Sequence, residues 1–245
     1  MSANRRLGAA GIRRGIRGAP AVAAAAAGWV PRDAANVARW WRADLGRTMV
    51  STKVSAWEDQ VEGVSVTQGT DAARPTVATH AGQDALVFSG AQALRGSGFT
   101  SLSNPTWSAI VIGEMDSAGA SEVFLDDGDG NTNNWLIWCA GATGWRANAG
   151  SNLTTTAVVQ TGLHAHWFKA ASSMSDYYID DWGTAAVSGN PGSNPNESMT
   201  VGATHADSLY LTGKVSEIII LDDGTLPGDL VAYLNGRYTG LSITT

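Results

Sequence analysis

Cysteine is nearly absent from this 245-residue chain, and charged residues are few. The single cysteine, Cys139, excludes an intrachain disulfide framework and a cysteine-based zinc site, so packing must stabilise the fold. Charged residues make up 16% of the chain, far fewer than in a disordered acidic chain or a coiled coil. The longest nearly apolar stretch, residues 19–30, is interrupted by Pro20 and Gly28. It is shorter than the roughly 20 residues of a membrane helix, which excludes a transmembrane span.

Glycine and tryptophan are abundant instead. The chain contains 29 glycines and 10 tryptophans, and 44% of its residues are hydrophobic. Many glycines indicate many tight turns, and the tryptophans supply large flat surfaces that helical bundles rarely use. The length suits one large all-β domain with a sizeable core.

Positive charge is concentrated at the start of the chain. The first 32 residues hold six arginines and no acid, so the remainder carries ten cations against 22 acids, a net charge of −12. Residues 1–30 therefore form an extended basic Gly/Ala-rich arm without a core pattern, and residues 31–245 form the body. The arginines expected to anchor the arm are Arg5, Arg6, Arg13, Arg14 and Arg17.

The arm is expected to contact a partner, because it cannot bury enough apolar surface to offset its own ordering. Acidic groups of neighbouring subunits are favoured as that partner. Nucleic acid is disfavoured, because the arm lacks interleaved aromatic residues and lysines and the body is acidic. A solvated basic tail is the remaining alternative.

Short β-branched and aromatic runs recur through the body between Gly, Asn, Asp and Ser clusters, a rhythm typical of an antiparallel two-sheet β-sandwich. The predicted strands are 86–89, 107–113, 122–125, 135–139, 155–160, 165–170, 177–180, 198–202, 208–211 and 215–221. Two helices are predicted, over residues 33–45 and 226–238. In the first, Val37, Trp40, Trp41 and Leu45 would lie near one face.

Three stretches of the body carry a family resemblance. They are ARWWRADLG with VSAWEDQVEGVSVTQGTDAARPTVATHAGQDALVFSGAQAL, then HAHWFKA with DYYIDD, and finally LTGKVSEIIILDDGTLPGDLVAYLNGRYTG. Together they resemble the laminin-G-like, or concanavalin A-like, jelly-roll domain over about residues 38–240. The resemblance implies a jelly-roll sandwich, a fold that lectins, glycan hydrolases, adhesins and virion parts share.

Catalytic signatures are missing from the sequence. The Glu-x-Asp-x-x-Glu spacing that the resemblance implies for glycan hydrolases is absent, and the acidic cluster of Glu58, Asp59 and Glu62 is interpreted as a turn. No histidine lies in a serine nucleophile elbow, and no glycine-rich phosphate loop occurs. No catalytic residue is predicted, and the chain is expected not to be an enzyme. A carboxylate pair of Glu114 and Asp116 is the only enzyme alternative kept.

Metal binding is expected at one loop at most. Alternation at positions 164 and 166 places two histidines on one strand face, where they form a metal site or, more commonly, a surface pair. The loop LDDGDGNTNNW does not match an EF-hand, but the resemblance to calcium-dependent members of the fold allows a calcium site at the rim of the sandwich. Its candidate ligands are Asp126, Asp127, Asp129, Asn131 and Asn133. A turn without a metal ion is the alternative, because Asp, Gly and Asn are common turn residues. No other cofactor is expected.

Sugar contact would need an exposed aromatic face beside amide groups. Trp145 and Trp182 are the candidates, because their turn-like surroundings would project them outward, with Asn133 and Asn134 as hydrogen-bonding partners. Packing of both tryptophans against a loop or neighbouring subunit is the alternative.

These patterns predict a non-enzymatic structural component of a phage virion, a decoration or fibre-type protein of head or tail. It would be located in the virion, oligomeric, and anchored to neighbouring subunits by its arm, without a membrane contact. The alternative is a carbohydrate-binding lectin or adhesin module that recognises glycans on a host surface.

Overall fold

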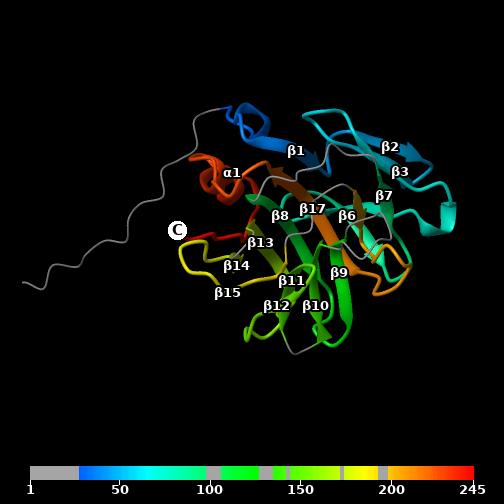
Figure 1. Ribbon diagram of the computed structural model, residues 1–245. Helices are drawn as coiled ribbons and strands as arrows, with labels where there is room; N and C mark the ends of the chain where they lie inside the picture. The colour runs from blue at the N-terminus through cyan, green and yellow to red at the C-terminus, as the bar shows by residue number, and fades with distance from the viewer. Residues whose placement is uncertain (1–27, 98–105, 127–134, 142–143, 172–173, 193–197) are drawn as a thin grey trace, which may run out of the picture.

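The computed structural model describes residues 28–97, 106–126, 135–141, 144–171, 174–192 and 198–245. The described chain contains 17 strands and one α-helix, drawn in Figure 1. The strands are β1 Val37–Arg42, β2 Arg47–Val50, β3 Lys53–Glu58, β4 Ser65–Thr67, β5 Thr76–His80, β6 Gln83–Ser89, β7 Leu94–Gly96, β8 Thr106–Met115, β9 Ser121–Asp126, β10 Trp135–Ala140, β11 Trp145–Ala149, β12 Asn152–Thr154, β13 Gly162–Ala171, β14 Ser175–Ile179, β15 Val187–Gly189, β16 Met199–Val201 and β17 Thr212–Leu221. The helix is α1, Leu230–Arg237, and two 3-10 turns lie at Pro31–Asp33 and Asp71–Ala73.

The strands form one connected antiparallel sheet that curls until it is nearly closed. In one wall, β8 is central and pairs with β13 and β17, while β1 and β14 extend this wall on either side. In the opposite wall, β9 pairs with β10 and β16, and β10 continues to β11 and β12. The predicted all-β antiparallel class is therefore confirmed, although the pairing gives one continuous sheet in place of two separate sheets.

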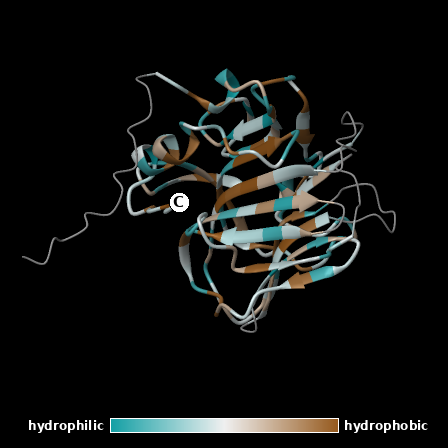
Figure 2. Cartoon of the chain, turned by 60° about the vertical axis from the view of Figure 1, so that its left-hand side comes forward, coloured by the Kyte–Doolittle hydropathy of each residue, from teal (hydrophilic) through white to brown (hydrophobic). Residues whose placement is uncertain are grey.

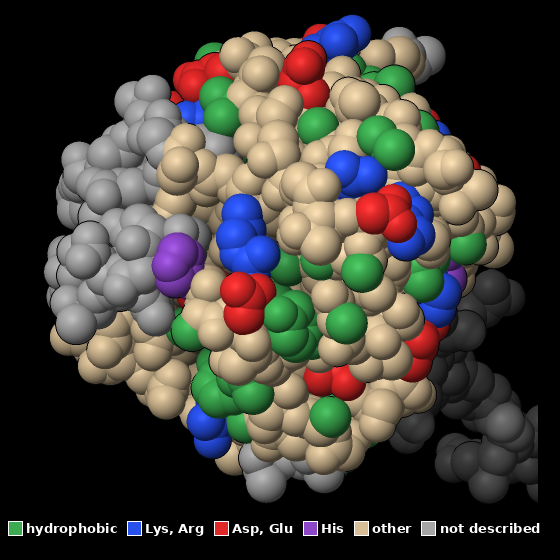
Figure 3. All heavy atoms as spheres, turned by 90° about the vertical axis from the view of Figure 1, so that its right-hand side faces the viewer, with side chains coloured by type: hydrophobic (Ala, Val, Ile, Leu, Met, Phe, Trp, Pro, Cys, Tyr) green, Lys and Arg blue, Asp and Glu red, His purple; other side chains and the backbone are tan. Residues whose placement is uncertain are grey.

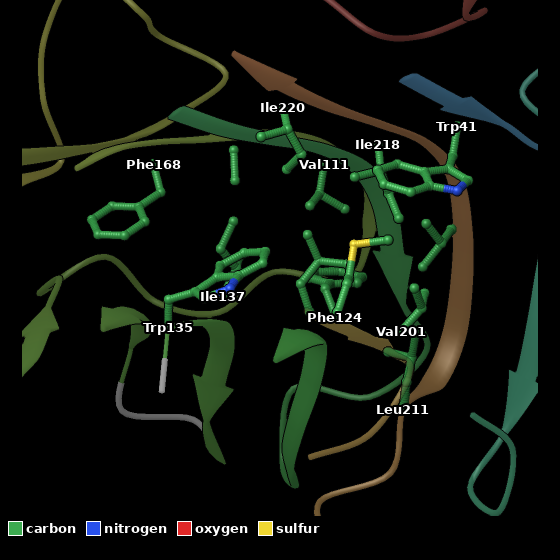
Figure 4. Packing of buried hydrophobic residues seen from close by; sticks show 14 of the residues in the cluster. Trp41, Val111, Phe124, Trp135, Ile137, Phe168, Val201, Leu211, Ile218 and Ile220 are labelled. Atoms are coloured by element: carbon green, nitrogen blue, oxygen red, sulfur yellow. The ribbon is translucent and has the colours of Figure 1, made fainter. Parts of the chain in front are cut away.

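The inner core is the buried cluster that this curled sheet encloses, and Figure 4 shows part of it. Alternation along the strands builds it: in β8, Trp107, Ala109 and Val111 face inward, while Ile110 and Ile112 face the opposite side. Residues from both walls meet there, including Trp41, Val111, Phe124, Trp135, Ile137, Phe168, Val201, Leu211, Ile218 and Ile220. Hydropathy colouring shows the same concentration of apolar residues on the strands (Figure 2).

A second buried cluster, the outer cluster, lies between the sheet and α1. Leu230 and Leu234 of α1 pack there with Ile219 of β17 and Trp167 of β13. The predicted helix at 226–238 is confirmed in type but begins later, because residues 227–229 form a turn closed by the hydrogen bond from Leu230 N to Pro227 O, 3.0 Å long.

Glu217 of β17 fixes the helix to the sheet. Its fully buried carboxylate accepts hydrogen bonds from Trp40 Nε1 at 2.5 Å, Tyr233 hydroxyl at 3.0 Å and Tyr238 hydroxyl at 2.6 Å. Burial raises the pKa of Glu217 above its ordinary value, against the opposing effect of these hydrogen bonds. Three donors thus satisfy a carboxylate that would otherwise be costly to bury.

The helix predicted over residues 33–45 is wrong. A 3-10 turn at Pro31–Asp33 leads into strand β1, which pairs with β17. Trp41 lies in the inner core and Trp40 in the outer cluster, so neighbouring tryptophans point to opposite faces. The doublet has to be a strand, because this is the only way both indole rings can be buried on opposite sides of one backbone segment.

Eight of the ten predicted strands coincide with observed strands, and two do not. Residues 155–160 form the irregular connection between β12 and β13, where Val158 is 69% exposed. Residues 208–211 follow a turn closed by Thr204 and Ser208, and the positive φ of Leu209, 49°, ends any extended run there. No helix in the described part of the chain is both long and apolar enough to cross a membrane.

Candidate functional site

The sheet does not close completely. Within the described residues, strands β12 and β15 each pair with one strand only, and their unpaired edges lie next to each other. We call the line where they meet the seam. A pocket of about 200 Å³, the seam pocket, opens there. Its lining residues are Trp145, Ala157, Val158, Gln160, His164, Ile179, Asp180 and Ala186.

A histidine–carboxylate pair supplies the polar centre of the seam pocket. His164 Nδ1 of β13 lies 2.6 Å from Asp180 Oδ2, at the end of β14. The other carboxylate oxygen of Asp180 accepts the Ala165 N–H at 2.8 Å. Both residues therefore have fixed positions, set by the β13–β14 hairpin.

The backbone of Asp180 is strained and firmly held. Its φ of 57° lies in the left-handed region, which non-glycine residues enter at a cost of about 1–3 kcal/mol. Asp180 N donates to Ala165 O at 3.0 Å, and Asp180 O accepts from Thr244 N at 2.9 Å. The C-terminal segment thus clamps the turn that carries the carboxylate, as expected where strain serves a site.

The carboxylate of Asp180 is ionised. Burial raises its pKa, but the hydrogen bonds from His164 and the Ala165 amide outweigh burial and hold the pKa below its ordinary value. An ionised carboxylate accepts hydrogen bonds, so His164 Nδ1 carries a proton. His164 Nε2 is buried and has no hydrogen-bond partner within the described residues. This nitrogen is therefore available to hydrogen-bond with a group outside the described part of the chain.

Trp145 supplies the aromatic surface of the seam pocket, and further rings pack against it within the core. The indole of Trp145 packs on the imidazole of His166, with ring centroids 4.4 Å apart, and stacks on Phe124 at 5.9 Å. The Tyr177 hydroxyl and His166 Nδ1 lie 2.9 Å apart. Burial lowers the pKa of His166 to about 3, aided by the neighbouring His164, so the His166 ring is neutral. Trp145 is therefore held in place by a buried, uncharged group of rings.

The predicted pair of histidines does share one strand face, since the rings of His164 and His166 lie 6.1 Å apart between centroids. They are not a surface pair, because His166 is fully buried. Among the described residues, no three His, Cys, Asp or Glu side chains are grouped so as to hold a metal ion.

The prediction that turns project Trp145 and Trp182 outward is wrong. Trp145 is 2% exposed, because it begins strand β11 and faces the inner core. Trp182 is 4% exposed and packs in the outer cluster against Trp167, with ring centroids 5.6 Å apart. Only Trp145 lines the seam pocket.

Most of the other predicted site residues lie outside the described residues. These are Arg5, Arg6, Arg13, Arg14 and Arg17 of the arm, and Asp127, Asp129, Asn131, Asn133 and Asn134 of the acidic loop. Asp126 is described: it is 1% exposed, and its Oδ2 accepts the backbone N–H of His205 at 2.6 Å.

The acidic residues considered for catalysis have structural partners. Asp59 accepts backbone N–H groups of Trp40, Val61 and Glu62, as a turn residue does, but it is 1% exposed, so the expectation of a solvated turn is wrong for this residue. Lys214 bridges Glu114 at 2.6 Å and Asp116 at 3.1 Å. The same Glu114 contacts His80 at 2.5 Å. These groups form an ion-paired cluster away from the seam pocket.

A second, more open groove of about 480 Å³ lies beside the β13–β14 hairpin. Its lining residues are Thr106, Lys169, Ala171, Met174, Asp176, Asp223, Gly224 and Thr225. Unlike the seam pocket, it contains a cation, Lys169. On the face shown in Figure 3, Lys/Arg and Asp/Glu side chains are interspersed, and the coloured hydrophobic side chains form small separate groups. That face presents no continuous basic patch of the kind that binds nucleic acid.

No protein-family model and no curated protein matches the chain. Solved structures do share its fold. The sialidase of Trypanosoma rangeli, in complex with the inhibitor DANA, is 13% identical with a TM-score of 0.57. The match covers 86% of this chain and 34% of the sialidase, so this chain spans about a third of that protein.

Two further structures are a domain of an arabinanase and an arabinofuranosidase. Domain 4 of an extracellular GH43 arabinanase from Geobacillus stearothermophilus, in complex with arabinotriose, is 16% identical with a TM-score of 0.56. The match covers 84% of this chain and 98% of that domain. An arabinofuranosidase complexed with arabinofuranosyl-alpha-1,2-xylobiose is 12% identical, with a TM-score of 0.55. The match covers 79% of this chain and 52% of the arabinofuranosidase. At such identities the likeness establishes the fold.

These comparisons contradict two predictions, the structural role in a phage virion and the absence of enzymatic activity. The three structures are carbohydrate-active enzymes or a domain of one, and none is a virion protein. The expectation that the chain is not an enzyme depended on the missing Glu-x-Asp-x-x-Glu spacing, which argues only against one type of glycan hydrolase. The alternative prediction, a carbohydrate-binding module, agrees better with the comparisons.

Proposed function

We propose that this chain is a carbohydrate-recognition domain and that the seam pocket holds a sugar residue. The observation that carries the proposal is the match over 98% of the arabinanase domain, whose structure contains arabinotriose. That match covers a whole domain, whereas the sialidase match covers a third of a larger enzyme. We further propose that the two walls of the curled sheet correspond to the two sheets of a laminin-G-like jelly roll.

The chemistry of the seam pocket supports this function. Sugars are bound by apolar or aromatic surface against their C–H faces, together with a few fixed polar groups for their hydroxyls. Trp145, Val158 and Ile179 supply apolar surface, while His164, Asp180 and Gln160 supply hydrogen-bonding groups. The pocket is lined from segments that flank the seam: Ala186 directly precedes β15, and Ala157, Val158 and Gln160 lie in the connection that follows β12.

Calorimetric titration of the full chain with neutral oligosaccharides, arabinotriose among them, tests the proposal. A blocking variant, Ala186→Trp, fills the seam pocket from an exposed position, so the fold should tolerate it. The matched control is His80→Ala, which removes a histidine–carboxylate contact outside the pocket. We expect saturable binding by the wild type and His80→Ala, and loss of binding in Ala186→Trp.

Absence of binding to every oligosaccharide would overturn the proposed function. Equal binding by wild type and Ala186→Trp would show that the sugar site lies elsewhere. Chromatography of the oligosaccharide after incubation separates recognition from cleavage, because only cleavage changes the length of the sugar chain.

A further inference from the structure

The charge of the seam pocket limits which sugars it can accept. Asp180 is the only acid among its lining residues, and the lining contains no Lys or Arg. The nearest arginine in sequence, Arg146, follows Trp145 on β11 and therefore points to the opposite face. There its guanidinium lies over the Trp138 ring, 4.8 Å from the ring centroid. A carboxylated sugar would place its anion near Asp180 with no Lys or Arg to balance it.

Asp180 determines which ring nitrogen of His164 is free to bind a ligand. Asp180 Oδ2 holds Nδ1 in its protonated form, at 2.6 Å. In the neutral imidazole, Nε2 is then an acceptor. This buried nitrogen has no partner within the described residues, and a buried acceptor without a partner costs free energy until it is satisfied. A sugar hydroxyl is a donor of the required kind.

The volume of the pocket limits how much of a glycan can enter. Its volume of about 200 Å³ is below the roughly 300–1,000 Å³ typical of sites for drug-sized ligands. Trp145 forms one part of its wall. The space therefore suits one sugar ring, with the rest of the oligosaccharide outside.

We propose that the seam pocket selects a single uncharged sugar residue, and that His164 Nε2 accepts a hydrogen bond from one hydroxyl of that residue. This inference rests on the proposed function. Asp180 is a positioning residue here, because it orients the imidazole and excludes anionic sugars.

Matched pairs of oligosaccharides test the selectivity. In each pair, one member ends in a neutral hexopyranose and the other in the corresponding uronic acid, so only the C6 group differs. We expect the full chain to bind the neutral member at least about tenfold more tightly. Gln160→Lys, which adds a cation at the exposed rim, should reduce that preference about tenfold.

A conservative substitution tests the role of His164. In His164→Asn the amide can still donate to Asp180, as Nδ1 does, but no atom replaces Nε2. We expect an about tenfold loss of affinity for neutral sugars with the melting temperature nearly unchanged, and no loss in the matched control His80→Asn.

The outcomes separate the two proposals. If neither member of any pair binds, the proposed function fails, and the inference fails with it. If the uronic acids bind equally well or better, and Ala186→Trp still blocks binding, the function stands and the selectivity is overturned. If His164→Asn binds neutral sugars as the wild type does, the role of Nε2 is overturned.

Discussion

His164 and Asp180 are joined across the β13–β14 hairpin, with Nδ1 and Oδ2 2.6 Å apart. This contact connects a strained turn with the centre of the seam pocket. Asp180 has a φ of 57°, and its side chain and backbone together hold β13 and the C-terminal segment. The same carboxylate thus supports the fold locally and orients the imidazole that lines the pocket.

Replacement of Asp180 by alanine should affect both properties. Asp180→Ala removes the acceptor for His164 and Ala165 and keeps a β-carbon in the left-handed region, so we expect a loss of about 2 kcal/mol in the free energy of unfolding. Sugar affinity should fall as well, because the imidazole is no longer oriented. Urea unfolding and calorimetry measure the two effects. Unchanged stability together with unchanged affinity would contradict the role given to Asp180.

Acid should destabilise the protein through His166. Its native pKa of about 3 lies below the ordinary value of 6.5, so between these limits the unfolded chain binds a proton that the native chain does not. Stability should therefore fall as the pH is lowered from 6.5 towards 3, by up to about 1.4 kcal/mol per pH unit from this group.

Urea unfolding at several pH values, for the wild type and His166→Gln, measures this contribution. Glutamine is neutral throughout, so the variant should show the shallower dependence on pH. Glu217, whose raised pKa acts in the opposite direction, is present in both proteins and cancels in the comparison. If the free energy of unfolding depends on pH equally in the two proteins, His166 is not the source of the acid destabilisation.

The two faces of β1 should be equally intolerant of truncation. Trp40 is 1% exposed and Trp41 is fully buried, and they lie in different clusters. Trp41→Ala should lower the free energy of unfolding by about 3–5 kcal/mol, and Trp40→Ala by a similar amount. The control Met49→Ala, at a position 42% exposed on β2, should change it by less than about 0.5 kcal/mol. A small effect at either tryptophan would contradict the two-sided burial.

Gly202 should not tolerate a side chain. Its φ is 83°, and a β-carbon there would lie 2.3 Å from the ring of Phe88. Gly63 has a similar φ of 74° with nothing within 4 Å, so it isolates the cost of backbone strain. We expect Gly63→Ala to cost about 1 kcal/mol, and Gly202→Ala to cost at least about 2 kcal/mol more. Equal melting temperatures for the two variants would contradict this packing.

The sequence predicts the central strands well, because their apolar runs are long and flanked by turn residues. Strands β8 and β17, Thr106–Met115 and Thr212–Leu221, extend the predicted runs by one to three residues at their ends. The tryptophan doublet of β1 misleads, since Val37, Trp40 and Trp41 also fit a helical spacing. A strand is distinguished from a helix here only by the buried clusters on both sides of the sheet. These clusters form in the tertiary structure, so the local sequence does not reveal them.

The candidate site is harder to predict than the fold. Its residues come from β11, the connection before β13, β13 itself and the end of β14, which alternation within one strand cannot bring together. Alternation does place His164 and His166 on one face. It does not reveal that Asp180 lies against His164, because that contact depends on the left-handed turn after β14. Trp145 was misplaced because its neighbours Gly144 and Arg146 resemble a turn.

NMR of the full chain labelled with ¹⁵N in its four histidines, titrated with arabinotriose, tests sugar recognition at the seam pocket most directly. Ring nitrogen signals report each imidazole separately. The predicted result is a saturable shift of the His164 Nε2 signal, with the His80 and His205 signals unchanged. Absence of any shift at His164 while the sugar binds, or absence of binding altogether, would contradict recognition at this pocket.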